Sequence, residues 1–598
     1  MAYITQAQIK IMKLIFGYMK KFFFFIFLAI GIKLLGTVSE LVLPSILEHI
    51  VDEIVPAGNL KEVCIWGLYM FITAIVCRQL NVSANRRAID NAHKISYEIR
   101  QDLFDKTMSL GGSQFDDLGL PSLISRMTSD SYNVQSFVQQ IQTLCVRAPM
   151  MLIGAVAVAA FMDLPLTLIL IVMLPILIAV IYFIYAKGIP LYTTVQKRLD
   201  TIVRIMRENI TGIRVVKALS KEDAETARYD KANIAMTDSD LMAATVMAIP
   251  GPLMQVCLNI GLSLVVLYGA HRVNSGAIKP GVILAFLTYF NMITMGVMGL
   301  SRIFVTMSKA SASAERIALV LAQDTSGPED AAYQDTDILS LPSDHIVFDH
   351  VSFSYGTGSN DNADFNGASR EKALDNISFT VKRGESLGII GPTGSGKSTI
   401  INLLMRFYAP DEGRITVDGQ SVLSYDKDTL RRKFGTVFQN DMIFMDTLQG
   451  NIDFGRNLED KAIAAAARDA MAEEFINGLP ERLAYKAAIK GANLSGGQKQ
   501  RIFIARALAA DPEILILDDS SSALDYKTDA SMRNAIRANH KDSTLIMVAQ
   551  RISSIMNLDH ILVLDNGRCI GYGRHEELLA ECETYRKIYE VQIGAMEG

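Results

Sequence analysis

Three features that would indicate other classes of protein are scarce or missing in this sequence of 598 residues. The six cysteines are scattered without metal-binding spacing, which argues against a disulfide framework or a zinc site. The formal net charge is only −5, so charge alone neither indicates nor excludes a nucleic-acid partner. No small-residue cleavage site follows the apolar stretch 22–30, so we expect no cleavable signal peptide.

Apolar residues, by contrast, are abundant. They make up 50% of the chain, and the mean hydropathy of +0.24 is high for a soluble protein, so part of the chain is expected to lie in lipid. The segment 8–21 mixes apolar residues with lysines and predicts an amphipathic helix on the membrane surface. Six stretches then approach the length of a membrane span, at 22–47, 63–83, 138–162, 164–187, 243–270 and 281–306.

The connections between these stretches are unequal in length and charge. Three are short and carry few cations, namely Lys61, Arg272 and Lys279. The two long ones, 84–137 and 188–242, have a helical pattern and carry Arg86, Arg87, Lys94, Arg100, Lys106, Arg126, Lys197, Arg198, Arg204, Arg207, Arg214, Lys217 and Lys221. By the positive-inside rule, the long connections and both termini lie in the cytoplasm of a multi-pass protein of the plasma or inner membrane.

Charged and adaptable side chains within the spans leave two interpretations open. Lys33 and Glu40 share one face of the first span, where they either face a transport cavity or belong to a structural ion pair or a snorkelling lysine. Met292, Met295 and Met298 form a stripe that would suit either an irregular apolar ligand or ordinary helix packing and lipid contact. Prolines are expected to kink or break spans at positions 44, 149, 175, 250 and 252.

After residue 322 the chain becomes polar and then takes on an α/β pattern. We expect a transmembrane domain at 1–322, with an elbow helix and six spans, a linker at 323–344 and an α/β domain at 345–598. The fold class is therefore membrane α-helical plus α/β. A polar insertion at 356–372 is expected to form a mobile loop.

The stretch 385–399 carries a specific phosphate-binding motif. An apolar run at 386–390 has the length of a strand, and the spacing G-x-x-x-x-G-K-S/T is then met by Gly391, Gly396, Lys397 and Ser398. Backbone N–H groups of such a turn, together with the start of the next helix, surround an anion. Lys397 is expected to reach the β- and γ-phosphates, and Ser398 to bind Mg²⁺. The sequence thus predicts a site for a nucleoside triphosphate.

Two further segments fit an ATPase. The buried-strand run 514–517 ends in Asp518, which is placed to hold Mg²⁺ beside a phosphate loop. The segment 493–501, NLSGGQKQR, sets serine and paired glycines at the start of a helix, a second anion-binding end that can close on nucleotide from another subunit.

Together these features resemble the exporter type of ATP-binding cassette (ABC) transporters over nearly the whole chain. The family's motifs correspond to GPTGSGKST at 391–399, Gln439, LSGGQ at 494–498, ILILDD ending at Asp519, and SALD at 522–525. Tyr355 is similar to the aromatic residue that stacks on adenine. The segments 115–130 and 208–222 resemble those whose coupling helices, here near Phe115 and Val215, dock on the ATPase domains.

The resemblance implies a set of site residues and cofactors. ATP-binding residues would be Tyr355, Gly391, Thr393, Gly394, Ser395, Gly396, Lys397, Ser398, Thr399, Gln439, Ser495, Gly496, Gly497, Gln498 and Asp518. Mg²⁺ ligands would be Ser398, Gln439 and Asp518. The catalytic pair would be Asp519 and Gln550.

The pattern departs from the family at three places. Asp519 stands where the family has a glutamate that positions the attacking water, and Gln550 where it has a histidine near the γ-phosphate. Ala488, Ile489 and Lys490 replace an acidic segment. Because the LSGGQ signature is intact, we expect a heterodimer in which this chain's own site is weak and its signature completes the site of a second half-transporter. A slow homodimer, such as a lipid flippase, is the alternative.

We therefore expect an ATP-driven exporter of amphipathic drugs, lipids or peptides that works by alternating access. An ATP-gated channel or regulatory subunit is a second hypothesis. Membrane lipid and a small amphipathic substrate are the other expected partners, and no nucleic acid. Six spans would exclude a soluble DNA-repair ATPase.

Overall fold

The computed structural model describes residues 14–323, 344–356, 372–520 and 523–594. The chain divides into two compact units, one made of 1–108 with 121–322 and the other of 109–120 with 323–598. Residues 14–21 of the predicted amphipathic segment are helical, and its first part lies outside the described residues. Nearly all of the predicted linker and of the predicted insertion at 356–372 also lies outside them.

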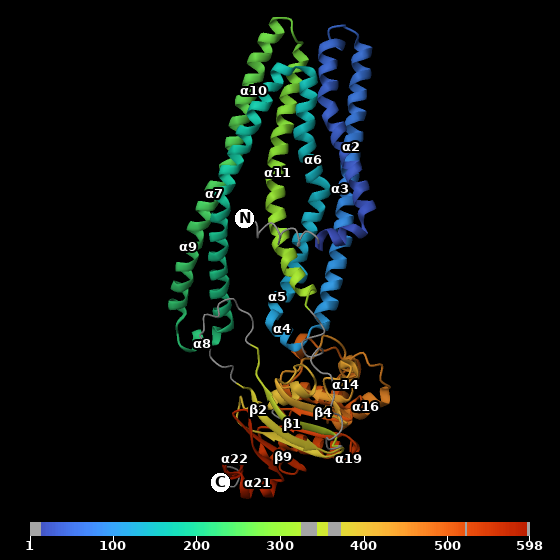
Figure 1. The fold of residues 1–598 in the computed structure, drawn as a ribbon, viewed down its shortest axis with the longest axis vertical. Helices are drawn as coiled ribbons and strands as arrows, with labels where there is room; N and C mark the ends of the chain where they lie inside the picture. The colour runs from blue at the N-terminus through green and yellow to red at the C-terminus, as the bar shows by residue number, and fades with distance from the viewer. Residues whose placement is uncertain (1–13, 324–343, 357–371, 521–522, 595–598) are drawn as a thin grey trace. The chain divides into compact units, whose positions relative to one another are not determined.

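The first unit is built from long helices that pack side by side (Figure 1). Its helical elements are α2 (Phe23–His49), the π-helical turn η1 (Ile50–Ile54), α3 (Leu60–Ser109), α5 (Leu120–Ser125), the π-helical turn η2 (Arg126–Asp130), α6 (Ser131–Met162), α7 (Leu164–Thr211), α8 (Ile213–Ala218), α9 (Glu222–Ala248), α10 (Pro250–Asn274) and α11 (Pro280–Leu321).

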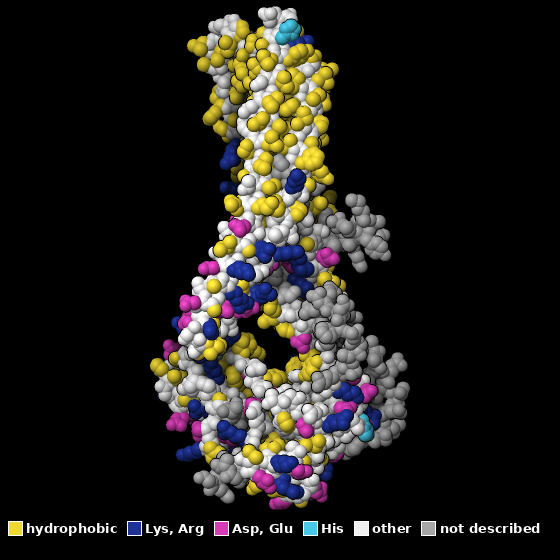
Figure 2. Space-filling view, turned by 90° about the vertical axis from the view of Figure 1, so that its left-hand side faces the viewer, with side chains coloured by type: hydrophobic (Ala, Val, Ile, Leu, Met, Phe, Trp, Pro, Cys, Tyr) yellow, Lys and Arg dark blue, Asp and Glu magenta, His cyan; other side chains and the backbone are white. Residues whose placement is uncertain are grey.

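Six helical segments among the described residues are long and apolar enough to cross a membrane, at 23–54, 60–109, 120–162, 164–211, 222–274 and 280–321. Each overlaps one of the predicted apolar stretches, so the prediction of six spans is confirmed. Most are far longer than the ~20 residues that cross a bilayer, so they continue beyond it. Figure 2 shows apolar side chains covering the visible face over the spans, with Lys and Arg side chains beyond this apolar band.

Proline marks helix starts in this unit more often than helix ends. α10 and α11 begin at Pro250 and Pro280, where the missing N–H costs no hydrogen bond. Asp163 begins α7, because its Oδ1 accepts a hydrogen bond from Leu166 N at 2.9 Å. Pro44, Pro149 and Pro175, which were expected to kink or break spans, lie inside α2, α6 and α7, so the helices are not broken there and the expected kinks stay a prediction.

The two charged residues of the first span have separate partners. Lys33 is buried and its Nζ donates to Asn81 Oδ1 at 2.8 Å and to Asn85 Oδ1 at 3.1 Å, both on α3. Glu40 accepts from Arg147 Nη2 on α6 at 2.7 Å. These contacts favour the structural interpretation of the two charges, which join α2 to its neighbours.

The predicted methionine stripe on α11 divides between packing and exposure. Met292 packs against an apolar core that includes Tyr289, Phe286 and Leu170. The side chains of Met295 and Met298 are exposed on the surface of this unit.

The second unit contains two sheets. The first has the order β2-β1-β4-β5 and is antiparallel, with β1 (Ile346–Phe353), β2 (Leu374–Val381), β4 (Glu412–Val417) and β5 (Gln420–Ser421). The second has the order β10-β9-β3-β8-β7-β6 and is parallel apart from β10, with β3 (Ser386–Ile390), β6 (Phe434–Val437), β7 (Ile514–Asp518), β8 (Thr544–Val548), β9 (His560–Asp565) and β10 (Arg568–Gly573). This α/β fold is the predicted one.

Helices complete the second unit: α4 (Gly112–Leu118), α13 (Lys397–Leu404), α14 (Lys427–Arg432), α15 (Leu448–Asp453), α16 (Asp460–Asp469), α17 (Glu473–Asn477), η3 (Arg482–Ala484), η4 (Ile489–Gly491), α18 (Gly496–Leu508), α19 (Tyr526–Asn539), α20 (Ile552–Ile555), α21 (His575–Glu581) and α22 (Glu583–Gly594). One core lies between the two sheets and α13, and a second packs α16, α18 and α19 on the parallel sheet.

The short helix α4 packs within the second unit although it follows α3 directly in sequence. Gly112 N donates to Phe407 O at 3.2 Å, and the hydroxyl of Tyr408 donates to the Asp116 carboxylate. A Cβ on Gly112 would lie 2.7 Å from Phe407 O, so this approach requires glycine. Val215, in the other predicted coupling segment, lies on α8 and is exposed.

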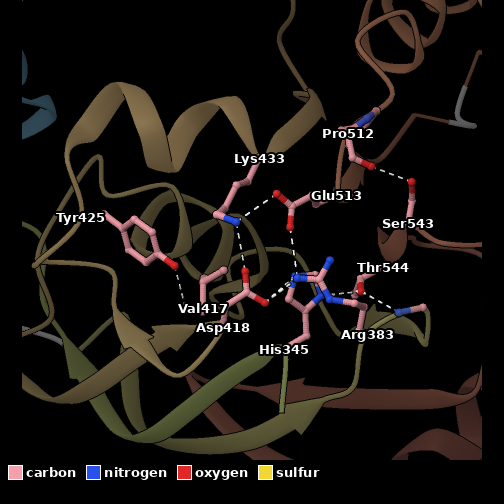
Figure 3. Close-up of polar contacts among 11 residues, drawn as sticks. His345, Arg383, Val417, Asp418, Tyr425, Lys433, Pro512, Glu513, Ser543 and Thr544 are labelled. Carbon is pink, nitrogen blue, oxygen red and sulfur yellow. Dashed lines mark hydrogen bonds and ion pairs between the residues drawn. The ribbon is translucent and has the colours of Figure 1, made fainter. Parts of the chain in front are cut away.

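An ionic cluster joins the two sheets where β1 begins (Figure 3). Asp418, in the turn after β4, accepts from Arg383 at 2.6 Å and from Lys433 at 3.0 Å. Glu513, just before β7, accepts from Lys433 at 2.9 Å and Arg383 at 3.1 Å. His345 is buried beside them.

Candidate functional site

The phosphate loop lies between β3 and α13, and its shape depends on glycine. Gly394 and Gly396 have φ of 84° and 95°, in the region that favours glycine. A Cβ on Gly391 would lie 2.1 Å from the backbone oxygen of Leu564, so the loop packs closely on the end of β9. Because β3 is a central buried strand, the loop sits at the carboxyl edge of the parallel sheet, with the start of α13 directed at the same space.

A cavity of about 490 Å³ opens over this loop, within the size range of small-molecule sites. The sequence predicted most of its lining: Tyr355, Thr393, Gly394, Gly396, Lys397, Ser398, Thr399, Gln439, Asp518, Asp519 and Gln550. Two predicted residues of the loop are not among the described lining residues. Gly391 packs against Leu564, and Ser395 is buried.

Residues that the sequence analysis missed complete the lining, namely Lys372, Ala373, Val548, Asn566 and Gly567. The dipeptide Asn566–Gly567 has positive φ at both positions and turns β9 into β10. Its composition signals a hairpin turn, but only the strand order β9-β3 places that turn beside the phosphate loop.

Lys397 lies over the loop it follows. Its Nζ donates to Gly391 O at 2.9 Å and to Pro392 O at 2.7 Å. Burial lowers the pKa of this ammonium, while the nearby carboxylates of Asp518 and Asp519 act in the opposite direction. The side chain is therefore a cation that the protein has already desolvated next to the cavity.

Oxygen donors converge at the cavity from two elements. Ser398 Oγ, on α13, donates to Asp518 Oδ2, at the end of β7, at 2.9 Å. Burial raises the pKa of Asp518, and the neighbouring Asp519 adds to this. A hydroxyl, a carboxylate and the side-chain amide of Gln439, which also lines the cavity, form the type of oxygen donor set that hard divalent cations prefer.

The two predicted catalytic residues contact each other. Gln550 Nε2 donates to Asp519 Oδ2 at 2.8 Å, and Gln439 also hydrogen-bonds the Asp519 carboxylate. Asp519 has φ of 50°, and its backbone N donates to Val548 O at 3.0 Å, so it is held beyond the end of β7. Burial raises the pKa of Asp519, and Lys397 and the two amides counteract the shift.

Tyr355 lies at the opposite side of the loop, on the strand end that precedes the insertion. Its hydroxyl donates to Thr399 Oγ1 at 3.2 Å and accepts from Asn402 Nδ2 at 3.2 Å. Edge contacts with Phe353 and Tyr408 hold the ring, which is 39% exposed. The ring therefore presents a fixed and accessible aromatic surface.

The predicted signature residues form a separate feature. Ser495 caps α18, and it exchanges hydrogen bonds with Gln498: Ser495 N donates to Gln498 Oε1 at 2.8 Å, and Gln498 N donates to Ser495 Oγ at 3.3 Å. Gly496 and Gly497 form the first turn. These four residues are absent from the described lining of the cavity over the phosphate loop. Among the departures just before them, Ile489 is exposed and Lys490 has φ of 56°.

Comparisons with known proteins agree with this arrangement. The model of the ABC transporter transmembrane region matches residues 26–297, and that of the ABC transporter matches 374–522. The uncharacterized ABC transporter ATP-binding protein YfiB of Bacillus subtilis (strain 168) is 35% identical, covering 93% of this chain and 94% of that protein. The putative ABC transporter ATP-binding protein exp8 of Streptococcus pneumoniae is 29% identical over 99% of each chain.

Among solved structures, a bacterial Atm1-family ABC exporter with ATP bound is similar in fold. Its TM-score is 0.78, and the match covers 94% of this chain and 98% of that one at 24% identity. The likeness shows the fold of this chain, in which six apolar helices precede an α/β unit.

Proposed function

The chain belongs to the ABC transporter family, and from that premise we propose that it is the weakly hydrolysing subunit of a heterodimeric exporter of amphipathic compounds. It is an ATPase-coupled exporter and a multi-pass membrane protein whose nucleotide-binding domain is cytoplasmic. The observation that carries the proposal is the Asp519–Gln550 pair, which occupies the catalytic end of the cavity with a short carboxylate and an amide.

Each residue of the site has a role in this proposal. The loop amides and Lys397 bind the phosphates, and the exposed ring of Tyr355 stacks on adenine. Ser398, Gln439 and Asp518 would hold Mg²⁺, which when bound would neutralise phosphate charge. Asp519 orients the attacking water and accepts its proton. Ser495, Gly496, Gly497 and Gln498 face the nucleotide of the second subunit.

The chemistry at this chain's own site should be slow for two reasons. An aspartate carboxylate lies about 1.5 Å further back than that of a glutamate, and a displacement of about 1 Å in an active site can cost roughly 10²-fold in rate. The Gln550 amide donates a hydrogen bond but cannot become a cation next to the phosphate. ATP binding, rather than hydrolysis at this site, therefore drives the change between inward-facing and outward-facing spans.

The domain boundaries are part of the same proposal. Residues 1–322 form the transmembrane domain, 323–344 the linker and 345–598 the nucleotide-binding domain. The segment 109–120, which packs with the second unit, is its connection to the spans.

The test is to restore the glutamate and the histidine that the family has at positions 519 and 550. The full chain in lipid nanodiscs is assayed for ATP turnover as wild type, Asp519→Glu and Asp519→Glu with Gln550→His. We expect turnover to rise about 10²-fold in the double variant and to fall below the slow wild-type rate in Asp519→Ala. Wild-type turnover that already matches the double variant would refute the weak-site proposal.

The heterodimer and substrate parts need their own measurements. Co-purification of this chain with a second half-transporter that has Glu and His at the corresponding positions supports the pairing, whereas a stable, fully active homodimer refutes it. Uphill uptake of an amphipathic fluorescent compound into inverted vesicles, dependent on ATP, supports export. Ion conductance under ATP without uptake would instead support a channel.

A further inference from the structure

A side chain from the C-terminal helix holds the backbone that carries Gln550. Gln592, on the last turn of α22, accepts a hydrogen bond at its Oε1 from Ile552 N at 2.8 Å. Its Nε2 donates to Gln550 O at 2.8 Å. The side-chain amide of Gln592 thus pairs one backbone N–H and one backbone carbonyl of the segment 550–552. This segment follows the end of β8 and leads into the start of α20.

The same segment reaches the nucleotide cavity through its side chain. Gln550 Nε2 donates to Asp519 Oδ2 at 2.8 Å, so three hydrogen bonds of equal length connect α22 to a carboxylate that lines the cavity. Arg533 of α19 donates to Ser553 O and Ser554 O at 3.1 Å and holds the next residues from another direction. The position of Gln550 therefore depends on contacts made by two helices outside the cavity.

The C-terminal helix has its own anchors, independent of Gln592. Tyr585 is fully buried, and its hydroxyl is hydrogen-bonded to His575 Nδ1 at 2.7 Å. Cys582, just before α22, is also buried in the core of this unit. Removing the Gln592 amide should therefore leave α22 in place while it frees the segment 550–552.

We propose that Gln592 is a positioning residue of the nucleotide site, which acts through Gln550 on the carboxylate of Asp519. The inference rests on the proposed role of Asp519 and Gln550 in hydrolysis. Through Gln592, the C-terminal helix α22 then influences the rate of ATP hydrolysis. Because a hydrogen bond contributes only modestly to stability, the expected effect of its loss is a change of rate rather than a loss of folding.

The experiment uses the full chain in nanodiscs with three variants. Gln592→Ala removes both hydrogen bonds, Gln592→Glu keeps an acceptor for Ile552 N but places a carboxylate against Gln550 O, and Glu590→Ala is the control from the exposed side of the same helix. Two quantities are measured: amide hydrogen exchange at Ile552, and kcat and KM for ATP.

We expect exchange at Ile552 to become roughly tenfold faster in Gln592→Ala and to stay near wild type in Gln592→Glu and Glu590→Ala. We expect kcat to fall about tenfold in both Gln592 variants, with KM for ATP within about twofold, since the phosphate loop and Tyr355 are untouched. Equal changes in kcat and KM would mean a general disturbance of the fold and would overturn the proposal. Unchanged kcat with faster exchange would overturn it as well.

A double variant separates this inference from the proposed function. If Gln592 acts through Gln550, the change Gln592→Ala lowers kcat no further in a Gln550→Ala background. A further tenfold loss there would overturn the inference while leaving the role of Gln550 intact. If Gln550→Ala alone leaves kcat unchanged, the proposed role of Gln550 fails, and any loss of kcat in Gln592→Ala then refutes the route through Gln550.

Discussion

Acidification should weaken the nucleotide-binding unit through one buried histidine. The side chain of His345 is fully buried at the start of β1, and its Nδ1 lies 2.7 Å from Thr544 Oγ1. Thr544 Oγ1 already accepts from Gly384 N at 3.0 Å, so the hydroxyl proton is free to be donated to Nδ1 of a neutral ring. Burial lowers the pKa of His345, against which the nearby carboxylates Asp418 and Glu513 act.

The charges that face this histidine come from several elements and largely cancel. Arg383 after β2 and Lys433 before β6 lower the pKa of His345, and each is already paired with both carboxylates of the cluster (Figure 3). A protonated His345 would add a third cation to two anions in a buried place. Protonation is therefore coupled to loss of the folded state.

The direction in which stability changes with pH follows from the difference in proton binding between the folded and unfolded states. The folded-state pKa of His345 lies below the ordinary histidine value of about 6.5, so the unfolded chain binds more protons once the pH falls below about 6.5. Stability should then fall by up to about 1.4 kcal/mol per pH unit until the folded-state pKa is reached. Burial also lowers the pKa of His575, so this partly exposed group adds to the slope in the same direction but less strongly. The lowered pKa values of Asp418 and Glu513 matter only near pH 4 and below.

The assay is urea unfolding of the full chain in detergent between pH 7.5 and pH 5, followed by hydrogen-exchange labelling of β1 and β8 at one fixed pH. His345→Asn keeps an acceptor for Thr544 and should reduce the slope of unfolding free energy against pH below about pH 6.5. His575→Gln is the matched variant and should reduce the same slope. A slope in His345→Asn equal to that of the wild type would refute the reasoning.

Three other perturbations have defined outcomes. Gly391→Ala places a Cβ 2.1 Å from Leu564 O, and the backbone at this position can move away only at a high energetic cost. We therefore expect a destabilisation of about 3 kcal/mol and loss of ATP binding, both measured by thermal unfolding with and without nucleotide. Arg147→Met leaves Glu40 unpaired in a spanning segment and should lower the yield of folded protein in detergent. The double variant Arg147→Met with Glu40→Gln should recover the yield, and equal yields of the single and double variants would contradict a structural ion pair. Tyr355→Leu should weaken ATP binding about tenfold without changing folding, measured by titration with a fluorescent nucleotide.

The features that could be predicted from the sequence are mostly those that depend on short, continuous patterns of residues. The six spans follow from continuous apolar runs, and the phosphate loop from glycines at fixed spacing between an apolar strand and a helix, so both could be recognised without knowing any long-range contact. Prolines at 44, 149 and 175 do not end their helices, because neighbouring helices can hold a span together where a proline removes a backbone hydrogen bond.

The contacts that could not be predicted join residues far apart in the chain. Lys33 finds Asn81 and Asn85 on the next helix rather than Glu40 on its own. Asn566 and Gly567 reach the cavity only because β9 pairs with β3. The pairing order of strands and helices is fixed by packing across the whole unit, which no short pattern encodes.

We predict that a nucleotide-driven movement reaches the spans through the short helix α4. It belongs to the second unit through Gly112 N bonded to Phe407 O and through the Tyr408 hydroxyl bonded to Asp116, yet covalent bonds join it to α3 and α5 of the first. Phe407 and Tyr408 follow α13, the helix that begins at the phosphate loop. Because a Cβ on Gly112 would lie 2.7 Å from Phe407 O, we predict that α4 follows a displacement of the segment after α13 and passes it along the backbone into α3 and α5. Widening this contact with Gly112→Val should therefore reduce substrate-dependent uptake more than ATP binding, and equal losses of both would contradict a role in coupling.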